Sequence, residues 1–284
     1  MRDLLNEKKI VVYEVIPPKG VDTERCIKLC LSMLDAGVDA IAITDMPVGS
    51  VRIAPWAIGK ILKDMGHDVL VHFTRTSRNV LRIESDLMGI WTLGIENVLL
   101  LSGDDPKTGD YPNATRVEDV SITDLIRLTK LMNSGTDLAG NTLKGSTNFF
   151  VGAVFNPLDE RDIVRARGKI EAGVDFLVSQ PVFKRGVEFD LGVPVIASVA
   201  FFKSERQMRY FSDVPGIYVP KRFFRDTKDA GSAFIKDYTF ERMLEVIEDI
   251  AKRVSGFYIP GIVRDVDKVR RMVEFVESLQ SGSE

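Results

Sequence analysis

Short apolar runs alternate with longer segments of mixed polarity along the whole chain. The apolar runs have the length of β-strands and lie at about 10–15, 39–44, 69–74, 97–101, 148–154, 175–180, 193–199 and 255–259. The segments between them have the length of helices and lie at about 22–36, 52–65, 77–93, 121–133, 159–172, 203–212, 232–253 and 264–279. One run and one segment together take roughly 30 residues, the length of a β–α step.

The predicted strands carry few polar residues in their interiors, as expected for a parallel sheet that is covered on both faces. Several predicted helices end at a glycine just before the next strand, as in AGVDAIAI, LGIENVLLL and AGVDFLVS. Eight strands alternating with helices predict an α/β fold. We expect a single closed (β/α)8 TIM barrel over residues 1–284 rather than an open doubly wound sheet.

Two stretches interrupt this alternation. Residues 102–120 form a long loop rich in Gly, Pro and Asp after the fourth strand, and residues 213–231 are irregular. Long loops that follow strands in compact domains are often functional. We therefore expect the first stretch to contribute to a site.

Polar residues with catalytic potential stand at or just beyond the ends of six predicted strands: Glu14, Thr44, His72, Ser102 with Gly103 and Asp104, Asn156, and Gln180. In a parallel barrel the carboxyl ends of all strands open on one face. The pattern predicts that these residues, which are far apart in the sequence, surround one pocket.

Composition and charge argue against several classes of partner. Of the 284 residues, 45% are hydrophobic and 28% charged, and the net charge is −3. A nucleic-acid-binding surface usually shows a basic excess, so we expect no nucleic-acid partner. The first nine residues lack the apolar stretch of a signal peptide, and no apolar run approaches the roughly 18 residues of a membrane span. We expect a cytoplasmic protein with no membrane partner.

Missing motifs narrow the chemistry further. The chain has no G-x-S-x-G, P-loop, G-x-G-x-x-G or H-E-x-x-H motif. It has only two histidines, so no multi-histidine metal site is expected. Cys26 and Cys30 lie four residues apart and are interpreted as small buried hydrophobic side chains. Carboxylates, amides and a bound cofactor remain as carriers of the chemistry.

Glu14 is a candidate proton donor. It ends an apolar strand and is followed by Pro17 and Pro18, which stiffen the chain. Partial burial would raise the pKa of its carboxyl group toward neutrality. The alternative is a structural carboxylate paired with an arginine inside the barrel.

Asp104 and His72 are candidates for contact with a cofactor. Asp104 follows Gly103, whose lack of a side chain lets the backbone approach a ligand, and its carboxylate can accept a hydrogen bond. A turn residue bonded to its own backbone is the alternative for Asp104. His72 can bond a ring or a phosphate, or it can be purely structural.

The segment from Asn156 through the helix with Asp162 and Lys169 carries cations that could bind a phosphate group. A solvated helix face is the alternative. Gln180 would place an amide at the pocket mouth, and Phe202 offers an aromatic ring there. Core packing is the alternative for Phe202.

Taken together, these residues resemble the methylenetetrahydrofolate reductase family, which are flavoproteins built on a (β/α)8 barrel, over nearly the whole chain. The run from Glu14 to Lys19 matches E-x-x-P-P-K, which resembles the opening motif of the family. SGDDP resembles the flavin loop, and the stretch from Lys169 to Phe183 resembles the connection between the flavin-binding helix and the folate-contacting glutamine. DYPNATRVEDV and the later LAGN look most like the bacterial branch that is often fused to a homocysteine methyltransferase domain.

The resemblance implies an activity and a role for each matching residue. The activity is reduction of 5,10-methylenetetrahydrofolate to 5-methyltetrahydrofolate by NAD(P)H, through a bound FAD rather than FMN. Glu14 resembles the general acid, Asp104 the residue that contacts the pterin and modulates the flavin, and Gln180 and Phe202 the substrate-binding residues. The remaining positions fall where the family binds FAD: Thr44, His72, Ser102, Gly103, Asp104, Asn156, Asp162 and Lys169. The resemblance also implies a homo-oligomer and a possible separate methyltransferase partner.

Several positions depart from the pattern of the family. Ser102 replaces the usual arginine, Ser121 and Ile122 replace a tyrosine and an alanine, and Gly168 replaces a second arginine. These changes leave two alternatives open: a folate-binding methyltransferase barrel without flavin, and a non-catalytic partner subunit of a methyl-transfer complex.

Overall fold

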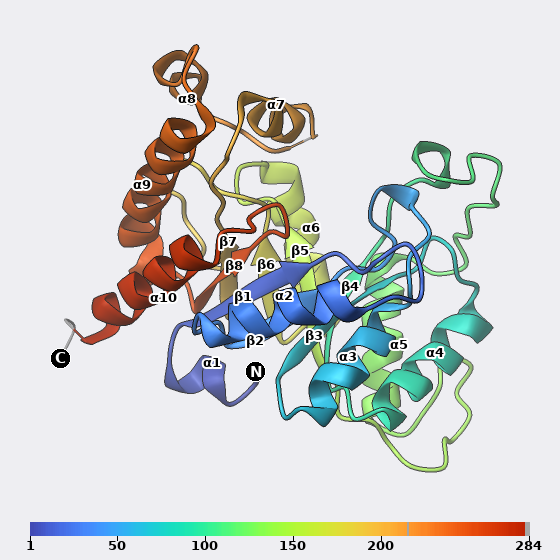
Figure 1. Cartoon of the computed structure of the whole chain (residues 1–284). Helices are drawn as coiled ribbons and strands as arrows, with labels where there is room; N and C mark the ends of the chain where they lie inside the picture. The colour runs from blue at the N-terminus through green and yellow to red at the C-terminus, as the bar shows by residue number, and fades with distance from the viewer. Residues whose placement is uncertain (215, 282–284) are drawn as a thin grey trace.

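In the computed structural model, which describes residues 1–214 and 216–281, eight parallel strands close into one barrel (Figure 1). They are β1 (Ile10–Val15), β2 (Ala40–Ile43), β3 (Val69–Thr74), β4 (Asn97–Leu101), β5 (Phe150–Phe155), β6 (Phe176–Ser179), β7 (Val195–Ser198) and β8 (Gly256–Ile259). Each strand pairs with the next along the chain, and β1 closes the ring because Val12 lies opposite both Ala40 of β2 and Tyr258 of β8. The predicted (β/α)8 barrel is confirmed.

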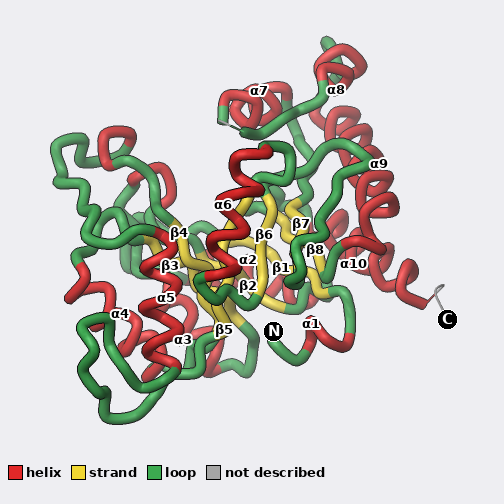
Figure 2. The backbone as a smooth tube through the Cα atoms, turned by 180° about the vertical axis from the view of Figure 1, so that it is seen from behind, coloured by secondary structure: helices red, strands yellow, loops and turns green. Residues whose placement is uncertain are grey.

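Helices cover the outside of the barrel (Figure 2). The eight helices predicted from the sequence are α2 (Glu24–Asp35), α3 (Pro55–Asp64), α4 (Val80–Thr92), α5 (Ile122–Asn133), α6 (Glu160–Glu171), α7 (Glu205–Asp213), α9 (Ser232–Ile250) and α10 (Val266–Ser281). None of the helices in the described ranges has the length and apolar content to cross a membrane.

Alternating side chains along each strand divide the core into two layers. The larger layer lies between the strands and the helices and includes Tyr13, Ile41 and Phe73. The smaller layer fills the barrel interior and includes Val12, Leu70 and Tyr258. Because side chains alternate along a strand, a residue two positions after a member of this second layer also points into the barrel, near the carboxyl end of its strand.

The two ends of the barrel differ. At the amino-terminal end, Met1 and the short helix α1 (Leu4–Glu7) pack against the interior layer and close it, a feature that the sequence pattern did not predict. At the other end, α7, α8 (Lys221–Asp226) and the loop after β4 rise above the strands (Figure 1). Helix α8 lies in the stretch predicted to be irregular, and burial of Phe223 fixes it to the core.

Candidate active site at the carboxyl ends of the strands

Glu14 is a partly buried carboxylate on the inner face of β1. The hydroxyl group of Tyr258 donates to its Oε2 at 2.7 Å, and the backbone N–H of Gly261 donates to its Oε1 at 3.0 Å. Burial raises the pKa of Glu14, and these two hydrogen bonds oppose the increase. No arginine pairs with this carboxylate among the described residues, so it does not form the salt bridge that was the alternative interpretation.

His72 is buried inside the barrel on β3 and faces the same tyrosine. Its Nε2 lies 3.0 Å from the Tyr258 hydroxyl oxygen, and the two rings are stacked at an angle of 26°. Burial lowers the pKa of His72 to about 4, although the charge of Asp45 acts in the opposite direction. The imidazole ring is therefore neutral near pH 7.

Titration of His72 predicts a loss of stability in mild acid. Its pKa lies below the unfolded value of 6.5, so between pH 6.5 and about 4 the unfolded chain takes up a proton that the folded chain refuses. The free energy of unfolding should fall by about 3 kcal/mol across this window through His72 alone and level off below it. Urea denaturation between pH 7 and 4 measures this decrease. In His72→Gln the free energy of unfolding should fall by about 3 kcal/mol less over this range than in the unsubstituted protein. In His67→Gln, a change at the other histidine, the full decrease should remain. An unchanged pH dependence in His72→Gln would contradict the assignment.

Thr44 and Gln180 also lie at strand ends on this face. The buried hydroxyl group of Thr44 donates to the carbonyl oxygen of Val15 at 3.4 Å, a long contact. The backbone N–H of Gln180 donates to the carbonyl oxygen of Phe155 at 2.7 Å, which extends the β5–β6 ladder by one residue. The side-chain amide of Gln180 has no hydrogen-bond partner in the described ranges, so its donor and acceptor groups are available to a ligand.

The loop after β4 starts with Ser102, Gly103 and Asp104. Gly103 has a φ of +89°, and a Cβ atom there would come within 2.9 Å of the Thr74 side chain, so this position requires glycine. The exposed Asp104 accepts a hydrogen bond at 2.6 Å from the backbone N–H of Val48. Val48 belongs to η1 (Pro47–Gly49) and has a φ of +58°, a strained value for a β-branched residue. Asp104 thus stabilises the loop after β2.

Asp162 and Lys169 lie on α6 and Asn156 lies just before it, and each of the three is already bonded within the chain. Asp162 accepts from the backbone N–H of Asn156 at 2.7 Å, and the Asn156 amide donates to the carbonyl oxygen of Gly216 at 2.8 Å. Lys169 is buried and donates to the carbonyl oxygen of Val154 at 2.6 Å. Burial lowers the pKa of Lys169, and the charge of Asp162 partly opposes this. The structure therefore brings these three residues together and bonds each of them to the backbone.

Phe202 lies in the core and not at the surface of the pocket. Its side chain is fully buried and stacks on Phe183 with 5.2 Å between ring centroids, and Phe211 meets it edge-on. Core packing, the alternative interpretation from the sequence, describes this position. A substrate could reach the Phe202 ring only if this aromatic cluster opened.

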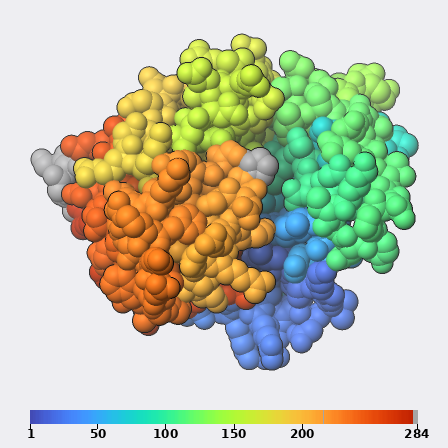
Figure 3. Space-filling view, turned by 90° about the horizontal axis from the view of Figure 1, so that it is seen from above, coloured from blue at the N-terminus to red at the C-terminus, as the bar shows by residue number. Residues whose placement is uncertain are grey.

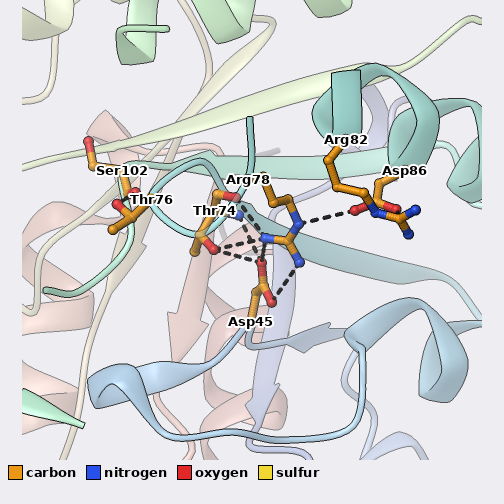
Figure 4. Close-up of polar contacts among 7 residues, drawn as sticks. All are labelled: Asp45, Thr74, Thr76, Arg78, Arg82, Asp86 and Ser102. Atoms are coloured by element: carbon orange, nitrogen blue, oxygen red, sulfur yellow. Dashed lines mark hydrogen bonds and ion pairs between the residues drawn. The ribbon is translucent and has the colours of Figure 1, made fainter. Parts of the chain in front are cut away.

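A buried network of ion pairs supports the site from outside the barrel (Figure 4). Arg78 donates to both oxygens of Asp45, at 2.6 and 3.3 Å, and to Asp86 at 3.2 Å. The guanidinium group also lies over the ring of Phe73. Asp45 follows Thr44 directly, so the network fixes the end of β2 against β3 and α4. Sequence reasoning missed it because the three charged residues lie on different elements.

The space-filling view shows a hollow on the face where the strands end (Figure 3). The loop after β4 lies on one side of the hollow, and the segments at about 200–214 and 216–230 lie on the other. Blue atoms, from the amino-terminal part of the chain, show inside the hollow. The arrangement suits a flat polar ligand that is held from several strands at once.

Comparisons with solved structures show the same fold. An uncharacterized protein from Clostridium thermocellum, described as binding two copies of 5-methyl-5,6,7,8-tetrahydrofolic acid, aligns with a TM-score of 0.62 and 14% identity over 96% of this chain and 98% of that one. EDTA monooxygenase from Chelativorans sp. BNC1 aligns with a TM-score of 0.56 and 11% identity over 97% and 94% of the two chains. The 7,8-dihydropteroate synthase from Vibrio fischeri ES114 aligns with a TM-score of 0.51 and 10% identity over 97% of this chain and 93% of that one.

Comparison of the amino-acid sequence with known proteins and family models identifies the family of the chain. No curated protein matches the chain directly. The family model for methylenetetrahydrofolate reductase matches residues 1–266, which include every strand of the barrel and each of the candidate site residues. The chain therefore belongs to the methylenetetrahydrofolate reductase family.

Proposed function

We propose that this protein reduces 5,10-methylenetetrahydrofolate to 5-methyltetrahydrofolate, with a bound FAD and with NAD(P)H as the source of hydride. The observation that carries the proposal is Glu14, a carboxyl group in the barrel mouth that has a raised pKa and pairs with no cation among the described residues. Membership of the family and the folate ligands described for the Clostridium thermocellum protein support a folate substrate.

Glu14 acts as the general acid in this proposal. Burial keeps its carboxyl group protonated at a higher pH than usual, so that a proton is available to a nitrogen of the folate ring. That protonation opens the five-membered ring and leaves the methylene carbon able to accept hydride. The hydrogen bonds from Tyr258 and Gly261 then stabilise the carboxylate that remains.

The chain offers free hydrogen-bonding groups for a flavin ring around the hollow. The Gln180 amide and the backbone N–H of Gly103 lack partners among the described residues, and the Thr44 hydroxyl has only a long one. These groups fit a heteroaromatic ring system that both donates and accepts hydrogen bonds. A flavin held there supplies hydride transfer between the nicotinamide and the folate.

We assign the other predicted residues to two regions. Ser102, Gly103 and Asp104 would border the ring and the pterin, with Gln180 orienting the substrate opposite them. Lys169 would hold the phosphate end, because it keeps two further N–H donors beyond its bond to Val154. Asn156 and Asp162 would contact FAD beside it, away from the phosphate groups. We assign His72 a contact with the cofactor through Nδ1, because its Nε2 faces Tyr258. We assign Phe202 no direct contact with a ligand in the conformation described.

The visible spectrum of the purified protein tests the cofactor. We expect absorbance near 450 nm, present on purification or restored by FAD, and its loss on anaerobic addition of NADH or NADPH. Comparing the two nicotinamides identifies the preferred one. A colourless protein that binds neither FAD nor FMN would contradict the proposal.

A specific observation favours one second candidate. The side chains of Asn156 and Asp162 and one donor of Lys169 already bond within the chain, which is also the arrangement expected of a barrel that binds folate without flavin. In that case 5-methyltetrahydrofolate would bind to the colourless protein. Isothermal titration with this folate, in the presence and absence of FAD, separates the two candidates.

A further inference from the structure

Three side chains from three strands form one hydrogen-bonded row across the barrel interior. Tyr258 of β8 stands in the middle: its hydroxyl group donates to Glu14 of β1 at 2.7 Å and lies 3.0 Å from Nε2 of His72 on β3. Strands β1 and β8 are neighbours, but β3 is separated from β8 by β1 and β2. The row therefore bridges the interior rather than following the sheet.

The chemistry of the three groups fixes the direction of the row. When Glu14 is ionised it can only accept, so the Tyr258 proton points to Glu14 and His72 must donate through Nε2–H. When Glu14 is protonated the row can reverse, because the carboxyl O–H can donate to Tyr258 and Tyr258 can donate to an unprotonated Nε2. Both states leave every member bonded, which is required of buried polar groups.

We propose that Tyr258 is the positioning residue of the proton donor, holding the Glu14 carboxyl group and stabilising the carboxylate after proton transfer, with His72 as the group that orients Tyr258. This inference rests on the proposed function, in which Glu14 is the acid. It gives His72 a role that differs from contact with a cofactor.

The surroundings of the row support this role. Burial raises the pKa of Tyr258 well above its usual range, so it stays neutral and serves as a donor, and the neutral His72 adds no positive charge beside Glu14. Two other titratable groups interact with the row through charge from outside the barrel interior: Asp45 acts on His72, and Tyr13, the neighbour of Glu14 on β1, is affected by the charge of Glu14. Tyr13 is also a buried tyrosine, but its hydroxyl group donates to the carbonyl oxygen of Val263 and does not touch Glu14.

Infrared titration of the carboxyl C=O band in the full-length protein tests the inference without any substrate. Glu14→Gln identifies the band by its loss. In Tyr258→Phe the carboxylate loses a donor, so we expect the Glu14 transition to move to higher pH. Tyr13→Phe, the matched control, removes a buried hydroxyl group elsewhere and should leave the transition unmoved. An unmoved transition in Tyr258→Phe, or an equal shift in Tyr13→Phe, would overturn the proposal.

A second pair of variants covers the case in which Tyr258→Phe does not fold. His72→Leu removes the outer donor and should shift the Glu14 transition to higher pH than in the unsubstituted protein. His72→Gln keeps an N–H donor, so its transition should lie closer to that of the unsubstituted protein. Equal transitions in His72→Leu and the unsubstituted protein would remove His72 from the row.

Kinetics then connect the row to the reaction. Tyr258→Phe should lower kcat for folate reduction by about tenfold, with KM within about twofold and its pH profile shifted upward. A tenfold rise in KM with kcat intact would instead indicate substrate binding and contradict a positioning role. If the unsubstituted protein reduces no folate, the proposed function fails, while the infrared titration still tests the row by itself.

Discussion

Glu14→Gln should abolish folate reduction while leaving reduction of the flavin by NAD(P)H intact. Glutamine fills the same space but offers no proton of comparable acidity, so the step that opens the folate ring loses its acid. General acid catalysis contributes about 10²–10⁴-fold, and we expect a loss of this size in the folate half of the reaction. Stopped-flow measurement of the two half-reactions under anaerobic conditions separates them.

A matched control for this substitution is Glu171→Gln. Glu171 is exposed at the end of α6, so the same chemical change there should affect neither half-reaction. If Glu14→Gln reduced folate at the rate of the unsubstituted protein, Glu14 would not be the acid. If it lost flavin reduction as well, the substitution would have disturbed the cofactor site rather than the proton transfer.

Arg78→Met should destabilise the folded protein by about 3–5 kcal/mol. The side chains of Asp45 and Asp86 are almost fully buried, and Arg78 is the buried cation between them. Methionine can fill the space, but it leaves both carboxylates without that partner in a medium that solvates charge poorly. Urea denaturation at neutral pH, with the free energy of unfolding extrapolated to water, measures the effect.

Arg82→Met provides the comparison, because Arg82 pairs with the same Asp86 from the surface. Its side chain is 63% exposed, and exposed pairs contribute at most about 1 kcal/mol. Similar free energies of unfolding for the two variants would show that the buried network does not stabilise the barrel. Since Asp45 follows Thr44, we also expect Arg78→Met to bind FAD more weakly than Arg82→Met.

The alternation of short apolar runs with longer helix-length segments was sufficient to predict the fold. The polar residues at the ends of the apolar runs are visible in the sequence, and the parallel arrangement of the strands predicted that they lie on one face. The pattern also predicted the partial burial of Glu14, because a carboxylate that ends an apolar strand must lie near the interior. The helix α8 was missed because it is held by the tertiary contacts of Phe223, which a local pattern does not record.

The partners of the site residues could not be predicted in the same way. Tyr258 lies 244 positions from Glu14 in the sequence, and only closure of the barrel brings the two together. A tyrosine in GFYI is equally consistent with core packing. Phe202 comes four residues after the end of β7, where the two-residue alternation no longer applies, so its direction into the aromatic cluster depended on the fold of α7 and α8.

Anaerobic single turnover tests the central claim most directly. The protein is reconstituted with FAD, reduced with one equivalent of NAD(P)H and mixed with 5,10-methylenetetrahydrofolate. We predict that the absorbance near 450 nm returns and that one 5-methyltetrahydrofolate forms per flavin reoxidised. Reduced flavin that stays reduced in the presence of the folate, with no 5-methyl product, would contradict the assignment of this barrel as a methylenetetrahydrofolate reductase.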